Sequence, residues 1–196
     1  EFGWDKAAVG LIGGALYWSY ALGQLINGNL GDRASARAFV GLGLFASALL
    51  NALFGLQGGM AGMALVWALN GWAQSTGWGP LVKTLSRWFD PQRRGLIAAL
   101  FGPCYVVGHA LSWVLAGWLI SRWDWRVAFW GPAVILAAFG TLWVLAMRDA
   151  PHETGHRLSL WSGERRGGPP SLAEFGHFLR SPQLRWGVII CLFSGM

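Results

Sequence analysis

Five apolar runs of about twenty residues dominate this chain and restrict it to folds built from membrane-spanning helices. They cover residues 7–27, 38–57, 61–81, 95–120 and 127–147, and a sixth begins near Leu184. Hydrophobic residues make up 54% of the chain and charged residues only 12%, whereas soluble domains carry about 25% charged residues. The sequence therefore predicts an all-α polytopic membrane protein.

The apolar runs divide the chain into three parts. We predict an incomplete transmembrane helical bundle over residues 1–147, a cytoplasmic loop over 148–183 and the truncated start of a second bundle over 184–196. Within the loop, Ser171 and Glu174 form a capping-box pattern that predicts a short amphipathic helix. The chain opens without methionine and stops inside an apolar run, so we expect a fragment.

The lysines and arginines predict the orientation of the spans. Twelve of the fifteen follow the first, third and fifth runs, and only Lys6, Arg122 and Arg126 lie on the other side. Basic loops stay in the cytoplasm, so the first side is cytoplasmic and the protein is expected in the inner (cytoplasmic) membrane. The net charge of +6 then reflects topology. We expect the lipid bilayer as a partner and no nucleic acid.

Three runs carry polar or aromatic side chains spaced along one helical face. They are Tyr17, Tyr20, Gln24 and Asn27 in the first run, Asn70, Gln74 and Trp78 in the third, and Tyr105, His109 and Ser112 in the fourth. Lipid would make such faces unfavourable, so we predict that they line a shared aqueous cavity with Lys83 beyond the third run. The alternative is that they join helices by interhelical hydrogen bonds, worth about 0.6 kcal/mol each.

His109 is open to two interpretations. As a histidine within a span, it could bind an anionic substrate or relay protons. It could equally be a packing histidine with a satisfied hydrogen bond.

The loop after the first run reads GNLGDRASAR from Gly28 to Arg37. It resembles the GxLaDRxGRR signature between the second and third helices of the major facilitator superfamily, although Ser35 and Ala36 depart from that pattern. The resemblance implies close helix contacts at the glycines and a cytoplasmic gate. The expected gate residues are Gly28, Asp32, Arg33, Arg37, Arg93 and Arg94.

Longer segments narrow the resemblance. NGWAQSTGWGPLVKTLSRWF, RGLIAALFGPCYVVGHAL, DWRVAFWGPA and RDAP resemble segments of the organophosphate:phosphate antiporter family. This implies a partial major facilitator fold: helices two to six, the central loop and the start of helix seven. Gln24 stands where a glycerol-phosphate transporter of this family carries lysine, Tyr105 where it carries histidine, and Lys83 replaces an arginine. Substrate identity is therefore open.

The resemblance implies a secondary active transporter that uses no cofactor and is monomeric when full length. It would exchange a small organic anion, a sugar phosphate or glycerol phosphate, for phosphate by alternating access. The alternatives are a membrane sensor for a sugar phosphate on the same scaffold and a proton-coupled transporter for another small solute.

The segment HETGH at residues 152–156 matches the H-E-x-x-H signature of zinc proteases. That chemistry requires both histidines on one helical face and a third ligand. Pro151 precedes the segment and Gly155 interrupts it, which favours a loop. We therefore expect neither a metal site nor an enzyme.

Overall fold

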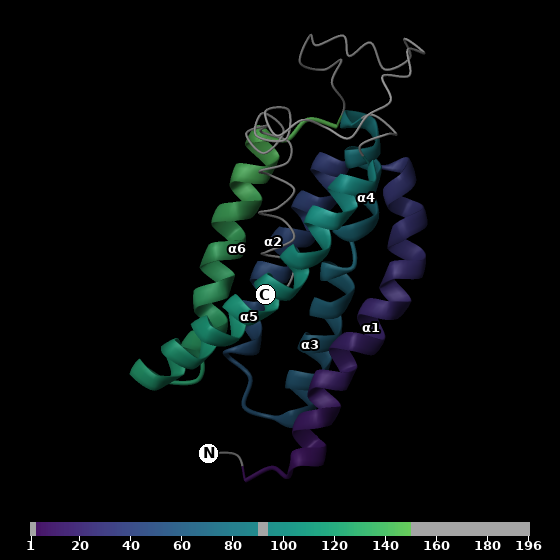
Figure 1. Ribbon diagram of the computed structural model, residues 1–196. Helices are drawn as coiled ribbons and strands as arrows, with labels where there is room; N and C mark the ends of the chain where they lie inside the picture. Colours follow the sequence, from purple (N-terminus) through teal and green to yellow (C-terminus); the bar gives the residue numbers. More distant parts are fainter. Residues whose placement is uncertain (1–2, 90–93, 150–196) are drawn as a thin grey trace, which may run out of the picture.

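The computed structural model describes residues 3–89 and 94–149, and all the regular secondary structure in this part is helical (Figure 1). The helices are α1 (Lys6–Arg33), α2 (Ala36–Phe54), α3 (Met60–Gln74), α4 (Trp78–Trp88), α5 (Arg94–Arg122) and α6 (Val127–Ala146). The predicted loop helix, the sixth run, HETGH and Arg93 lie outside the described residues.

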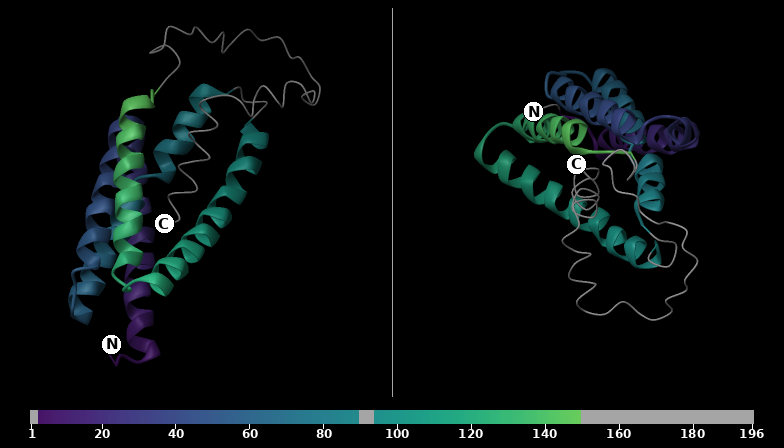
Figure 2. Two further views of the ribbon diagram at one scale, coloured as in Figure 1. Left: turned by 90° about the vertical axis from the view of Figure 1, so that its left-hand side faces the viewer. Right: turned by 90° about the horizontal axis from the view of Figure 1, so that it is seen from above.

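The helices form a bundle from which α5 leans away. α1 packs most extensively against α3, and α2 packs against α6 and α3, whereas α5 makes its main contact with α6. α5 meets α6 at its carboxyl end and diverges from α6 toward its amino end, which lies nearer α4 (Figure 2). Most of the α5 surface is therefore exposed within the described part of the chain.

The lengths of the helices confirm four of the predicted spans. α1, α2, α6 and residues Phe101–Arg122 of α5 are long and apolar enough to cross a membrane. The chain is thus a multi-pass membrane protein, as its composition predicts.

The prediction of one continuous helix over residues 61–81 is wrong, because α3 ends at Gln74 and α4 begins at Trp78. The hydroxyls of Ser75 and Thr76 donate to the carbonyls of Trp72 and Ala73, at 2.7 and 2.8 Å. Pro80 has no N–H and would clash with the carbonyl four residues earlier in a continuous helix. Local side-chain hydrogen bonds and this proline therefore break the helix in the last third of the predicted span.

Glycines set the distances between helices at three contacts. A Cβ added at Gly71 would overlap the Leu16 carbonyl of α1, and one added at Gly43 would overlap Thr76. At Gly31 an added Cβ would lie 2.7 Å from the Pro80 ring. α1, α2, α3 and α4 can approach this closely only because these positions lack a side chain.

Two apolar clusters hold the ends of the bundle. Val40, Leu81, Phe101, Trp143 and Met147 are buried together near the predicted cytoplasmic end. Ile12, Phe54, Met63 and Val66 are buried together toward the other end. Polar side chains lie between these clusters, near the middle of the helices.

Replacing Gly71 by alanine is expected to destabilise the bundle. The added Cβ meets backbone atoms of α1, which cannot rotate away, and such overpacking typically costs about 1–3 kcal/mol. Gly10→Ala is the matched control, since a Cβ there meets nothing within 4 Å. Thermal unfolding in detergent should show a lower midpoint for Gly71→Ala alone. Equal midpoints would contradict the close α1–α3 contact.

Candidate functional site

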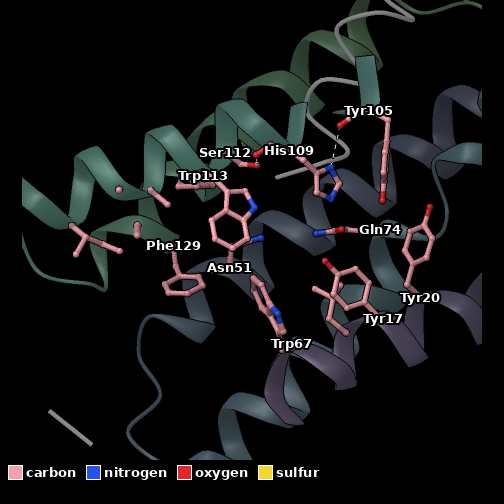
Figure 3. A pocket seen from close by; sticks show the side chains of 17 residues that line it. Tyr17, Tyr20, Asn51, Trp67, Gln74, Tyr105, His109, Ser112, Trp113 and Phe129 are labelled. Carbon is pink, nitrogen blue, oxygen red and sulfur yellow. Dashed lines mark hydrogen bonds between the residues drawn. The ribbon is translucent and has the colours of Figure 1, made fainter. Parts of the chain in front are cut away.

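A cavity of about 630 Å³ lies between α1, α2, α3, α5 and α6. Its walls carry one polar end and one aromatic, largely apolar end (Figure 3). The lining residues are Gly13, Leu16, Tyr17, Tyr20, Asn51, Trp67, Gln74, Tyr105, His109, Ser112, Trp113, Ala116, Gly117, Ile120, Ala128, Phe129 and Pro132.

The polar end brings together five of the predicted cavity residues from three separate helices. They are Tyr17, Tyr20, Gln74, Tyr105 and His109 (Figure 3). Each lies near the middle of its helix or, for Gln74, at the break between α3 and α4. Polar groups at this depth would be unfavourable against lipid, and here they share one hollow. That they bind substrate stays a prediction.

His109 is oriented by its own helix. Its Nδ1 lies 3.1 Å from the Tyr105 carbonyl oxygen, which can only accept, so Nδ1 carries the proton and donates. The Tyr105 ring lies against the imidazole, with 4.4 Å between ring centroids. The second nitrogen, Nε2, makes no hydrogen bond to another described residue and remains able to accept one, or to donate one when the ring is protonated.

Gln24 contacts a cavity residue, Tyr20, without reaching the cavity itself. It does not line the cavity, and its Nε2 donates to the Tyr20 hydroxyl at 2.8 Å. Since this amide occupies a lone pair of the hydroxyl, the Tyr20 proton stays free for another acceptor.

Asn70 and Asn27 do not face the cavity, which corrects the prediction for both. Asn70 is fully enclosed, and its Oδ1 accepts from the Ser47 hydroxyl of α2 at 2.6 Å. Asn27 Nδ2 donates to Ser75 Oγ at 2.7 Å and to the Trp72 carbonyl at 3.3 Å. Both amides join helices, as the alternative interpretation states. The Asn70 Nδ2 group has no hydrogen-bond partner among the described residues.

Trp78 does not line the cavity either. Its side chain is 43% exposed and borders a smaller apolar groove between α4 and α5. The groove has a volume of about 340 Å³, and its walls include Leu81, Val82 and Phe101. The break before α4 turns Trp78 away from the face that carries Gln74.

Lys83 is likewise absent from the cavity, and the structure gives it a different task. Its Nζ donates to the carbonyls of Gly31, Asp32 and Ala34 at 3.0, 2.7 and 2.9 Å. The last carbonyls of a helix lack intrahelical partners and carry partial negative charge. The ammonium of Lys83 therefore caps the carboxyl end of α1 and fixes α4 to it.

The structure contains only some of the contacts that we predicted for the gate motif. Of the two motif glycines, Gly31 permits close helix contact through its approach to Pro80, whereas a Cβ added at Gly28 would meet nothing within 4 Å. Asp32 and Arg33 are exposed and form no ion pair with another described residue. Arg94 begins α5, and its side chain lies outside the described part.

Arg37 connects α2 to α6 instead of pairing with Asp32. Its backbone N–H donates to Asp149 Oδ1 at 2.8 Å, and its guanidinium donates to the Val144 carbonyl. The Trp143 indole N–H donates back to the Arg37 carbonyl at 3.1 Å. Asp149 thus places a carboxylate at the amino end of α2, where it is favoured. A gating role for the motif stays a prediction.

Sequence reasoning missed four prominent cavity residues, Asn51, Trp67, Trp113 and Phe129. Three of them could have been predicted from their positions in the sequence. Asn51 is an amide within an apolar span, Trp67 lies two turns before Gln74, and Trp113 lies one turn after His109. Phe129 could not have been predicted from the sequence, because the direction of its side chain depends on how α6 packs.

These features define a class: a polytopic α-helical membrane protein with a cavity at mid-depth between its helices, polar at one end and apolar at the other. The family model described as Major Facilitator Superfamily matches residues 1–196. The chain belongs to the major facilitator superfamily, which confirms the predicted fold class.

Curated relatives agree with the narrower resemblance. The chain is 33% identical to a probable hexose phosphate transport protein of Chlamydia pneumoniae, over 79% of this chain and 34% of the relative. It is 31% identical to a glycerol-3-phosphate transporter of Bacillus subtilis, over 79% of this chain and 36% of the relative. It is 29% identical to the membrane sensor protein UhpC of Salmonella typhimurium, over 76% and 34%. The chain spans about a third of the length of these relatives.

Lys83→Met should loosen the junction between α1 and α2. The substitution keeps the unbranched apolar stem of the side chain and removes the ammonium, and hydrogen bonds from a charged donor contribute about 1.5–3 kcal/mol. Hydrogen exchange of the backbone amides at residues 31–37 should therefore accelerate. Arg87→Met, in the same helix but with an exposed side chain, is the control. Unchanged exchange in Lys83→Met, or equal acceleration in both variants, would contradict the capping role.

Proposed function

We propose that the whole protein is a secondary active transporter that exchanges a small organophosphate for phosphate by alternating access. The substrate class is a sugar phosphate or glycerol phosphate. The observation that carries the proposal is the convergence of Tyr17, Tyr20, Gln74, Tyr105 and His109 on one cavity at mid-depth. The names of the relatives support the choice of substrate.

The chemistry of the cavity suits an organic anion with hydroxyl groups. The tyrosine hydroxyls and the Gln74 amide can donate to phosphate oxygens and can also accept from substrate hydroxyls. The protonated His109 ring would add a charge-assisted hydrogen bond through Nε2. The described lining includes no lysine or arginine. In this proposal any further cationic contacts with the phosphate come from parts of the whole protein beyond the described residues.

The mechanism follows from the position of the cavity. A site near the midplane can open to one side of the membrane at a time when two helical halves rock about it. The glycine contacts and the Lys83 cap would let α1–α4 move together as one unit. In this proposal the whole protein acts as a monomer in the bilayer, with the small anion as its partner and no cofactor.

A second candidate is a membrane sensor that binds a sugar phosphate without net transport. One observation favours it: relatives of similar identity include a protein named as a membrane sensor. Transport and sensing can share one binding cavity, so the two proposals differ in turnover and not in ligand.

Reconstituted whole protein should exchange external labelled phosphate for internal phosphate, and glucose 6-phosphate or glycerol 3-phosphate should compete. Ligand-dependent protection from thermal unfolding without any exchange would favour the sensor. Absence of both, together with proton-driven uptake of a neutral solute, would contradict the organophosphate proposal.

His109→Phe should weaken phosphate exchange. Loss of a charge-assisted hydrogen bond of about 1.5–3 kcal/mol would raise the apparent KM by about 10-fold or more. Thr141→Ala is the control, because this hydroxyl is exposed on α6 and bonds only to its own helix at the Ala137 carbonyl. Similar KM values for the two variants would remove His109 from the substrate site.

A further inference from the structure

The turn between α5 and α6 carries two arginines that are each held against a tryptophan ring. Arg122 Cζ lies 5.8 Å from the centroid of the Trp118 ring. Arg126 Cζ lies 4.9 Å from the centroid of the Trp125 ring. Both distances fall within the range of cation–π attraction. The turn lies at the opposite end of the bundle from the Lys83 cap (Figure 1).

Each of these indole rings is itself fixed by a second aromatic ring. Trp118 meets Trp123 edge to face, with 5.4 Å between centroids. Trp125 meets Phe129 in the same way at 6.0 Å, and both pack against the apolar cluster of Ile12, Phe54, Met63 and Val66. The guanidinium groups are therefore positioned before any ligand arrives, which lowers the entropy lost on binding.

The turn keeps a net positive charge. Asp124 Oδ2 lies 3.5 Å from one Arg126 nitrogen, and Asp124 Oδ1 accepts from the Arg126 backbone N–H at 2.9 Å. Arg122 has no carboxylate partner among the described residues, so one positive charge is left over. A guanidinium presents its N–H donors in a planar fork that matches phosphate oxygens, so Arg122, which has no carboxylate partner in the described part of the chain, can bind such an anion.

The exposed aromatic rings place this charge at the membrane interface. Trp118 and Trp123 are 49% and 55% exposed, and neither lines the cavity. Exposed tryptophans at span ends lie at the level of the lipid headgroups. The two arginines thus lie where lipid phosphates lie, on the side that the positive-inside rule keeps poor in basic residues.

We propose that the α5–α6 turn, Trp118 to Arg126, is a binding site for the headgroup of an anionic phospholipid on the non-cytoplasmic face. Arg122 and Arg126 bind the phosphate, while Trp118 and Trp123 contact the glycerol and acyl region. None of these four side chains lines the substrate cavity, and the proposal does not depend on the proposed transport function.

Quenching of a local fluorophore tests this assignment. The label is placed on Ser121→Cys in protein whose Cys104 and Cys191 are replaced by alanine, because Ser121 is exposed beside Arg122. The protein is reconstituted in phosphatidylcholine vesicles with minor amounts of either brominated phosphatidylglycerol or brominated phosphatidylcholine. Local enrichment of the anionic lipid of about fivefold is expected for one net positive charge at the surface.

Arg122→Gln with Arg126→Gln should abolish the enrichment, and Arg87→Gln at the cytoplasmic end should leave it unchanged. If the double variant does not fold, high salt applied to protein with both arginines should remove the enrichment by screening. Equal quenching by the two brominated lipids with both arginines present would overturn the proposal. So would enrichment that survives in the double variant or in high salt.

Two further measurements test the role of Trp118 and the identity of the ligand. Trp118→Leu keeps both charges but removes the ring under Arg122, and it should lower the enrichment. Full enrichment in that variant would overturn the role of the Trp118 ring. Millimolar inorganic phosphate at constant ionic strength should have little effect, and complete competition would assign the site to free phosphate instead of lipid.

Discussion

The close packing of α1 against α3 and α4 is the contact on which the rest of the structure depends. It requires glycine at Gly31 and Gly71, where any side chain would meet the facing helix. Once the helices approach this closely, Asn27 reaches Ser75 and Lys83 reaches the last carbonyls of α1. Lipid cannot satisfy the Asn27 amide, so its hydrogen-bond partners must come from within the protein. The same packing places Tyr20 and Gln74 on one wall of the cavity.

The polar side chains of the spans serve two different purposes. Asn27, Ser47, Asn70 and Ser75 are enclosed between helices and hold them together. The tyrosines, Gln74 and His109 face a shared hollow. The membrane imposes the same requirement on both sets, since each polar group must avoid lipid. A neighbouring helix shields the enclosed amides and hydroxyls from lipid, and the cavity does so for the tyrosines, Gln74 and His109.

Sequence periodicity predicted four of the spans and the polar end of the cavity, and its errors have physical causes. It gives the face of a helix on which a residue lies but not what covers that face at a given depth. Asn70 and Gln74 share a stripe one turn apart, yet Ser47 of α2 covers only Asn70. Lys83 was assigned to the cavity because nothing in the sequence shows how closely α4 approaches α1. The helix break could have been predicted from Ser75, Thr76 and Pro80 together.

The most direct test is to label introduced cysteines with a water-soluble, membrane-impermeant thiol reagent. Such a reagent reaches positions that face the cavity but not positions enclosed between helices. Single cysteines at Gln74, Tyr105, Asn70 and Asn27 would be compared in the whole protein, reconstituted in lipid without its native cysteines. The account predicts that the thiols at Gln74 and Tyr105 react in at least one conformational state, while those at Asn70 and Asn27 stay protected in all. Unreactive thiols at both Gln74 and Tyr105, or a thiol at Asn70 as reactive as these, would contradict it.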